Sequence, residues 1–141
     1  MVAGRVVKVG LALLAVVHLV IGVLAIAAPR WFFENFPGYG PGWTAAHPPY
    51  NQHLTIDLGA TFLAFGVLLA LALLLADRRV TAVVLVGLVV FSAVHLGYHL
   101  LRPGDLAGPP LVAGTVSLAV GVLVPLGLLW LNRRTRAGQV A

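Results

Sequence analysis

The side chains that could take part in chemistry are few, and two pairs of them share a helical spacing. The chain has five histidines, four acidic residues and no cysteine. His53 and Asp57 are four residues apart, and so are His95 and His99. Residues at that spacing lie one turn apart on the same face of an α-helix. Imidazole and carboxylate groups are ligands for transition metals, so each pair is a candidate half of a metal site.

We therefore predict one metal site that joins the two pairs. Its ligands would be His53, Asp57, His95 and His99, two from each of two helices, around a zinc, iron or copper ion. His18 falls on another apolar segment, about one helical turn deeper, and would line the same cavity. In this hypothesis Asp57 and His18 are the catalytic residues.

The same residues support other interpretations. His53 and His99 would also suit the membrane interface, and His18 would suit a hydrogen bond to a backbone carbonyl. Asp57 lies near a helix start, where the helix dipole favours a negative charge. A series of titratable side chains could instead carry protons toward His18, as in membrane pumps. Two histidines on different helices could hold a haem, although the spacing of four within each pair argues against it.

Composition places these residues in a membrane protein. Of the 141 residues, 60% are hydrophobic and 9% are charged, and the mean hydropathy is +1.01. Soluble domains carry roughly 25% charged residues. So few charges exclude the disordered, coiled-coil and nucleic-acid-binding classes. The lack of cysteine excludes disulfides, thiolate metal sites and iron–sulfur clusters.

Four apolar stretches are long enough to cross a bilayer, which takes about 20 residues. They predict an all-α, four-helix transmembrane bundle that forms a single domain over residues 1–141. We expect helices over about 7–28, 53–76, 80–101 and 108–132, and an aromatic loop over 30–52. The connection 77–79 is so short that the second and third helices are predicted to be antiparallel neighbours. Gly114, Ser117 and Gly121 predict close helix packing by the fourth helix.

Basic residues predict the orientation of the bundle. One side of the four-helix arrangement carries Arg5, Lys8, Arg78, Arg79, Arg133, Arg134 and Arg136. The other side carries only Arg30 and Arg102. Cytoplasmic loops hold the excess of lysine and arginine, so both termini are predicted to be cytoplasmic. The protein would then be a multi-pass plasma-membrane protein with its histidine site near the outer face.

The aromatic loop admits two interpretations. Seven of the chain's aromatic residues lie there: Trp31, Phe32, Phe33, Phe36, Tyr39, Trp43 and Tyr50. They predict a short interfacial helix over residues 31–36 and either a plain aromatic belt or a lid over the histidine site. Glu34 and His47 are further candidate ligands. The groups expected to border the site with hydrogen bonds are Tyr50, Asn51, Gln52 and Tyr98.

The run DLGA at 57–60, followed by LAFG at 63–66, resembles the DoxX-like group of small bacterial membrane proteins. The four-span layout with a long first outer loop resembles that group as well. The resemblance implies the four-helix fold and a link to quinone-dependent oxidation, and it brings no site residues.

Two classes of function follow from these patterns. The first is a metal-dependent membrane enzyme, an oxidoreductase or a hydrolase, that acts on a lipophilic substrate. The second is a non-enzymatic membrane subunit or small-ligand-binding bundle whose polar residues connect the helices. The expected partners are the lipid bilayer, a lipophilic molecule such as a quinone, and further copies of the chain, but not nucleic acid.

Overall fold

The computed structural model describes residues 2–40 and 42–134, and within them the regular structure is entirely helical. The helices are α1 (Val2–Ala27), α2 (Pro29–Asn35), α3 (Gln52–Leu75), α4 (Arg78–Leu101) and α5 (Gly108–Arg134). The four long helices, α1, α3, α4 and α5, are long and apolar enough to cross a membrane. The predicted all-α fold is thus confirmed. Arg136, which contributed to the predicted orientation, lies outside the described residues.

Local capping explains where several helices begin and end. The Asn51 side chain accepts a hydrogen bond from the backbone N–H of Leu54 at the start of α3. Asp77 does the same for Arg79 and Val80 at the start of α4. Such caps satisfy N–H groups that have no partner inside the helix. The short helix expected after the first span is present as α2 and begins at Pro29, a residue suited to a first helical position.

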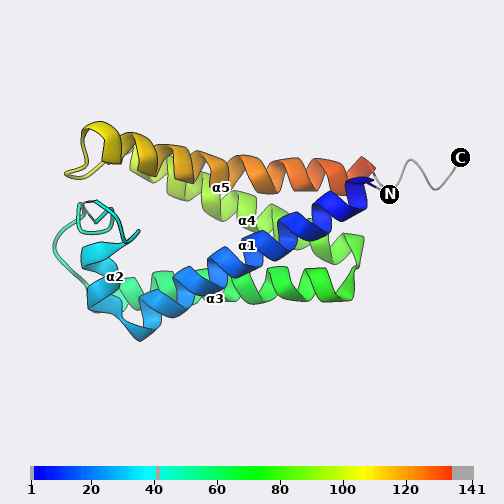
Figure 1. The fold of residues 1–141 in the computed structure, drawn as a ribbon, viewed down its shortest axis with the longest axis horizontal. Coiled ribbons are helices and arrows are strands. Elements are labelled where there is room, and N and C mark those ends of the chain that lie inside the picture. The colour runs from blue at the N-terminus through cyan, green and yellow to red at the C-terminus, as the bar shows by residue number, and fades with distance from the viewer. Residues whose placement is uncertain (1, 41, 135–141) are drawn as a thin grey trace, which may run out of the picture.

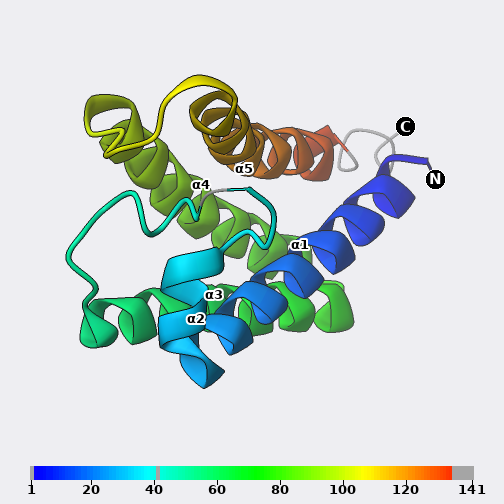
Figure 2. The same ribbon diagram turned by 60° about the vertical axis from the view of Figure 1, so that its left-hand side comes forward.

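The long helices form two pairs that meet at one end of the molecule and separate toward the other (Figures 1 and 2). The pairs are α1 with α3 and α4 with α5. We call the end with the start of α1 and the close of α5 the terminal end. The opposite end, which carries the loops 36–51 and 102–107, is the loop end. The predicted antiparallel hairpin of α3 and α4 is present, but these helices diverge from their turn toward the loop end (Figure 1).

Glycines allow α1 and α3 to pack backbone against backbone. A Cβ at Gly22 would lie 2.5 Å from the backbone nitrogen of Leu63, and one at Gly66 would lie 2.8 Å from that of Leu19. The close packing predicted for α5 at Gly121 is not found, because a Cβ there would meet only Ser92 Oγ, at 4.0 Å. Small residues therefore set the α1–α3 contact and leave space beside α5.

The buried core lies at the terminal end. It draws apolar side chains from all four long helices: Val7, Leu11, Ala15, Leu69, Ala72, Val84, Leu85, Leu88, Leu128 and Leu129. By contrast, the outer faces of the helices carry exposed apolar side chains such as Leu74, Val83 and Leu101. Apolar faces of this extent fit contact with lipid.

Candidate functional site

The space between the two helix pairs at the loop end is a pocket of about 650 Å³. Pockets for small molecules usually measure about 300–1,000 Å³ and have mainly apolar walls with a few polar groups. The apolar walls include Leu14, Val17 and Ile21 from α1, Leu58 and Phe62 from α3, and Leu118, Val120 and Val124 from α5. The core fills the terminal end of the bundle, so the pocket occupies the half that the core leaves open.

The segment after α2, residues 36–51, folds back over this helix and covers the pocket. Phe32 of α2 is buried, and its ring stacks on that of Phe36 with centroids 4.7 Å apart. The Thr44 hydroxyl donates hydrogen bonds to the backbone carbonyls of Phe32 and Phe33, at 3.1 and 2.6 Å. Trp43, the residue before Thr44, lines the pocket. The loop therefore lies where the lid interpretation predicts.

A second loop joins the first. The backbone N–H of Asp105 donates to the carbonyl of Ala46 at 3.0 Å. Gly104 has a φ of +63°, and a Cβ at this position would lie against that carbonyl. A glycine therefore suits this crossing, because it adopts positive φ without steric cost.

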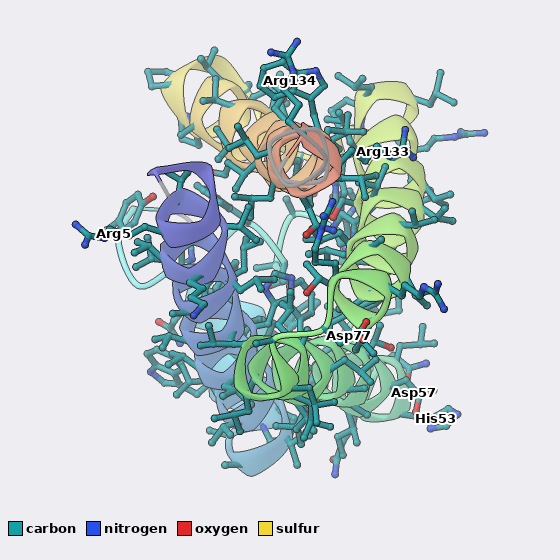
Figure 3. All side chains as sticks on the ribbon, turned by 90° about the vertical axis from the view of Figure 1, so that its right-hand side faces the viewer. Arg5, His53, Asp57, Asp77, Arg133 and Arg134 are labelled. Atoms are coloured by element: carbon teal, nitrogen blue, oxygen red, sulfur yellow. The ribbon has the colours of Figure 1, made fainter. Side chains whose placement is uncertain are left out.

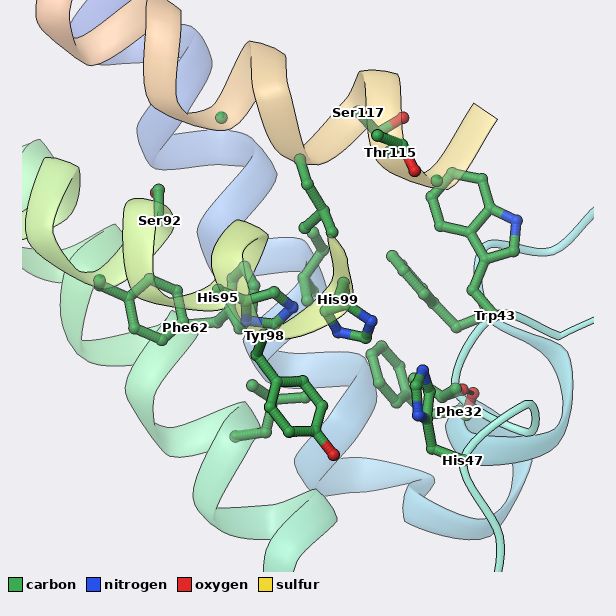
Figure 4. A pocket seen from close by; sticks show the side chains of 18 of the residues that line it. Phe32, Trp43, His47, Phe62, Ser92, His95, Tyr98, His99, Thr115 and Ser117 are labelled. Atoms are coloured by element: carbon green, nitrogen blue, oxygen red, sulfur yellow. Dashed lines mark hydrogen bonds between the residues drawn. The ribbon is translucent and has the colours of Figure 1, made fainter. Parts of the chain in front are cut away.

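Three histidines gather at the polar side of the pocket, and we call His47, His95 and His99 the histidine cluster (Figure 4). The rings of His95 and His99 stack with centroids 4.8 Å apart. The ring of His47 meets that of His99 edge-on, also at 4.8 Å. His47 comes from the loop, as the sequence allowed. Glu34 does not join the cluster, because it pairs with Arg30 on the exposed side of α2.

Aromatic rings continue from this cluster to His18. The ring of His95 contacts Phe91 at 5.6 Å, Phe91 contacts Phe62 at 5.6 Å, and Phe62 contacts His18 at 5.3 Å. We call this row of pocket-lining rings, from His18 to His47, the ring wall. His18 is buried, and its Nδ1 lies 2.7 Å from the carbonyl oxygen of Leu14. The predicted hydrogen bond from His18 to a backbone carbonyl is confirmed. His18 also lines the pocket, together with His95 and His99 but without Asp57.

His53 and Asp57 do not take part in the pocket. His53 Nε2 lies 3.4 Å from Asp57 Oδ2, and the two side chains are 80% and 58% exposed. Figure 3 shows both on the outer side of α3, away from the space between the helices. The prediction that His53 and Asp57 join His95 and His99 in one site is therefore wrong. A shared catalytic role for Asp57 and His18 has no geometric support.

The rotation of α3 explains this error. Successive helical residues are about 100° apart, so Asp57 lies about 200° from Gly59 around the helix axis. Gly59 and Gly66 pack against α1, which turns Asp57 toward the outside. The divergence of α3 from α4 separates the two predicted ligand pairs further (Figure 2). The positions of Gly59 and Gly66 in the sequence already indicate which face of α3 packs against another helix, and Asp57 is on the opposite face.

The predicted four-ligand metal site is not assembled. Among residues 2–40 and 42–134, no group of three or more histidine or acidic side chains is arranged to hold a metal ion. A metal cofactor stays a prediction from the sequence that the geometry of these residues does not favour.

The remaining polar groups are divided between the pocket and its surroundings. Asn51 and Tyr98 line the pocket as expected, whereas Gln52 is exposed and does not. The ring of Tyr50 packs against Phe33 at 5.2 Å, beside the pocket. Five hydroxyl-bearing residues that the spacing of ionisable residues does not point to also line the pocket: Thr44, Thr55, Ser92, Thr115 and Ser117.

No protein-family model, no curated protein and no solved structure matches this chain. The resemblance to the DoxX-like group therefore stays a prediction.

Proposed function

We propose that this integral membrane protein binds a lipophilic small molecule in the loop-end pocket. The observation that carries the proposal is a cavity of about 650 Å³ with apolar walls, to which His18, His95 and His99 add a few polar atoms. Such a combination gives affinity through apolar burial and orientation through a small number of polar contacts. Of the two functional classes that the sequence indicates, this is the second, a small-ligand-binding bundle.

We propose that the pocket opens toward the membrane between α1 and α5. Val17 on α1 and Val120 on α5 both line it, although they are 50% and 49% exposed. In a bilayer, this side of the molecule faces lipid. We therefore propose that the ligand enters from the membrane rather than through the covering loop.

In the proposed orientation the protein lies in the plasma membrane, and its terminal end faces the cytoplasm. Figure 3 looks onto that end, where Arg5, Arg133 and Arg134 lie with the α3–α4 turn. A cytoplasmic excess of basic residues is the usual topology signal. The pocket would then lie in the outer half of the bilayer.

Trp43 gives a direct test, because it lines the pocket. Trp31 and Trp130 are about half exposed on the outer surface and would both be replaced by phenylalanine. Bromododecane, an apolar heavy-atom quencher, is then added to the full chain in detergent micelles. We expect saturable quenching of Trp43 above the linear quenching caused by probe dissolved in the micelle.

Two variants of α5 make the test specific. Gly121→Leu places a side chain in the pocket, and we expect it to abolish the saturable component. Gly127→Leu is the matched control, because Gly127 is exposed and a Cβ there has no neighbour within 4 Å. Asp57→Asn should also leave binding unchanged. Equal quenching in the Gly121 and Gly127 variants, or no saturable quenching in the parent chain, would overturn the proposal.

A further inference from the structure

The hydrogen bond of His18 determines what its other ring nitrogen can do. A carbonyl oxygen only accepts hydrogen bonds, so the Nδ1 that lies 2.7 Å from Leu14 O must carry the proton. In a neutral imidazole the second nitrogen is then an acceptor. The proton on Nδ1 therefore leaves Nε2 with a lone pair and no N–H.

Among residues 2–40 and 42–134, no charged group lies against His18 to stabilise an imidazolium. It is 92% buried, and the rings of Phe62 and Phe65 lie 5.3 and 6.5 Å from its own. A buried charge without a partner is costly, so the neutral form is favoured. No described residue donates to Nε2, which lies across the ring from the Leu14 carbonyl and hence away from the α1 backbone.

The ring wall beside His18 suits a flat aromatic ligand. The centroid spacings of 5.3 Å for His18–Phe62 and 5.6 Å for Phe62–Phe91 are typical of stacked or edge-to-face ring pairs. A ligand ring placed against these faces would gain the same contacts. Its substituents would then lie within the apolar part of the pocket, next to the acceptor nitrogen of His18.

We infer that the pocket takes a lipophilic phenol whose hydroxyl group donates a hydrogen bond to Nε2 of His18. This inference rests on the proposed function and specifies the chemistry of the ligand. An ether or carbonyl oxygen at the same place would set one lone pair against another and leave Nε2 unsatisfied. Buried acceptors without a donor cost more than a formed hydrogen bond gains, so the hydroxyl group is the selective feature.

The test compares para-octylphenol with para-octylanisole, which differ only by a methyl group on the oxygen. Each displaces bromododecane from the pocket of the full chain, with Trp43 fluorescence as the readout. We expect the phenol to bind about tenfold more tightly than the ether, the ratio that one buried hydrogen bond gives. His18→Phe should remove this preference and keep the binding of the ether. The same substitution at exposed His53 is the control and should keep the preference.

A spectroscopic readout makes the result independent of the folding of any variant. In protein labelled with ¹⁵N-histidine, the non-protonated nitrogen of His18 should shift on addition of the phenol and stay unchanged with the ether. Equal affinities of the parent chain for phenol and ether, or no shift, would overturn the inference and leave the proposed function intact. Binding of neither compound, together with no saturable quenching by bromododecane, would overturn both.

Discussion

Arg78 and Asn132 hold the terminal end together by hydrogen bonds in both directions. The Arg78 guanidinium donates to the backbone carbonyl of Asn132, and the Asn132 amide donates to the backbone carbonyl of Arg78 at 3.0 Å. Arg78 begins α4 and Asn132 lies in the last turn of α5. The arginine thereby satisfies a carbonyl that has no partner inside its own helix. This contact fixes the start of α4 to the end of α5 at the terminal end.

Replacing Asn132 by alanine should destabilise the protein. Asn132 is buried, and its loss leaves the Arg78 carbonyl without this donor. We expect a loss of about 1–3 kcal/mol in the free energy of unfolding, measured by thermal or denaturant unfolding in detergent. Arg133→Ala is the control, because Arg133 supplies only its backbone carbonyl to Arg78. A loss of the same size in both variants would contradict the importance of the reciprocal pair.

The α1–α3 contact should not tolerate even a methyl group at Gly22. A Cβ there would lie 2.5 Å from the backbone of Leu63, and backbone atoms cannot move aside as a side chain can. Gly22→Ala should therefore destabilise the protein by about 1–3 kcal/mol, the usual cost of overpacking. Gly97→Ala should instead leave stability equal or slightly higher, because no atom approaches that position and alanine favours the helix. Comparison of the two melting temperatures checks the prediction.

The cap at Asp77 should make stability depend on pH. Backbone hydrogen bonds from Val80 and then Arg79 hold the pKa of the Asp77 carboxyl below its ordinary value of 3.8. Because the pKa of Asp77 is lowered in the folded state, the charged cap contributes its full stabilisation at pH values above 3.8. It is lost as the pH falls from there through the folded pKa.

Thermal unfolding at a series of pH values between about 6 and 2 would measure this effect. Asp77→Asn should show a smaller acid-induced fall in melting temperature, since a neutral asparagine still caps the helix. A fall of equal size in the parent chain and in Asp77→Asn would show that another group causes it.

The orientation of the bundle can be read from thiol labelling, since the chain has no cysteine of its own. Gly40→Cys, in the exposed loop at the loop end, should react with an impermeant reagent added to intact cells. Arg134→Cys, at the terminal end, should react only after the membrane is opened. The reverse pattern would contradict the orientation that the basic residues predict.

The sequence predicted the helices well and the site only in part. Long apolar runs admit few structures in a bilayer, so the four long helices and the short helix near Trp31 could be predicted from the sequence. The rotation of each helix was harder to predict, because α3 is apolar on nearly all sides and offers no amphipathic face. Spacing alone placed His95 and His99 on one face correctly. It also paired His53 with Asp57 correctly, but only the glycines that contact α1 show that this pair faces outward.

The unequal packing of the two ends has a mechanical consequence. A helix of 24 residues is roughly 36 Å long, at about 1.5 Å per residue. If one helix pair rotates as a lever about the terminal end by roughly 5°, its far end moves by roughly 3 Å, whereas the core near Leu85 and Leu128 is displaced far less. Such a rotation changes the width of the pocket without breaking the core contacts at the terminal end. Ligands of different width therefore demand little repacking of the core. The backbone hydrogen bond from Asp105 to Ala46, which joins the loops of the two helix pairs, limits how far the pairs separate.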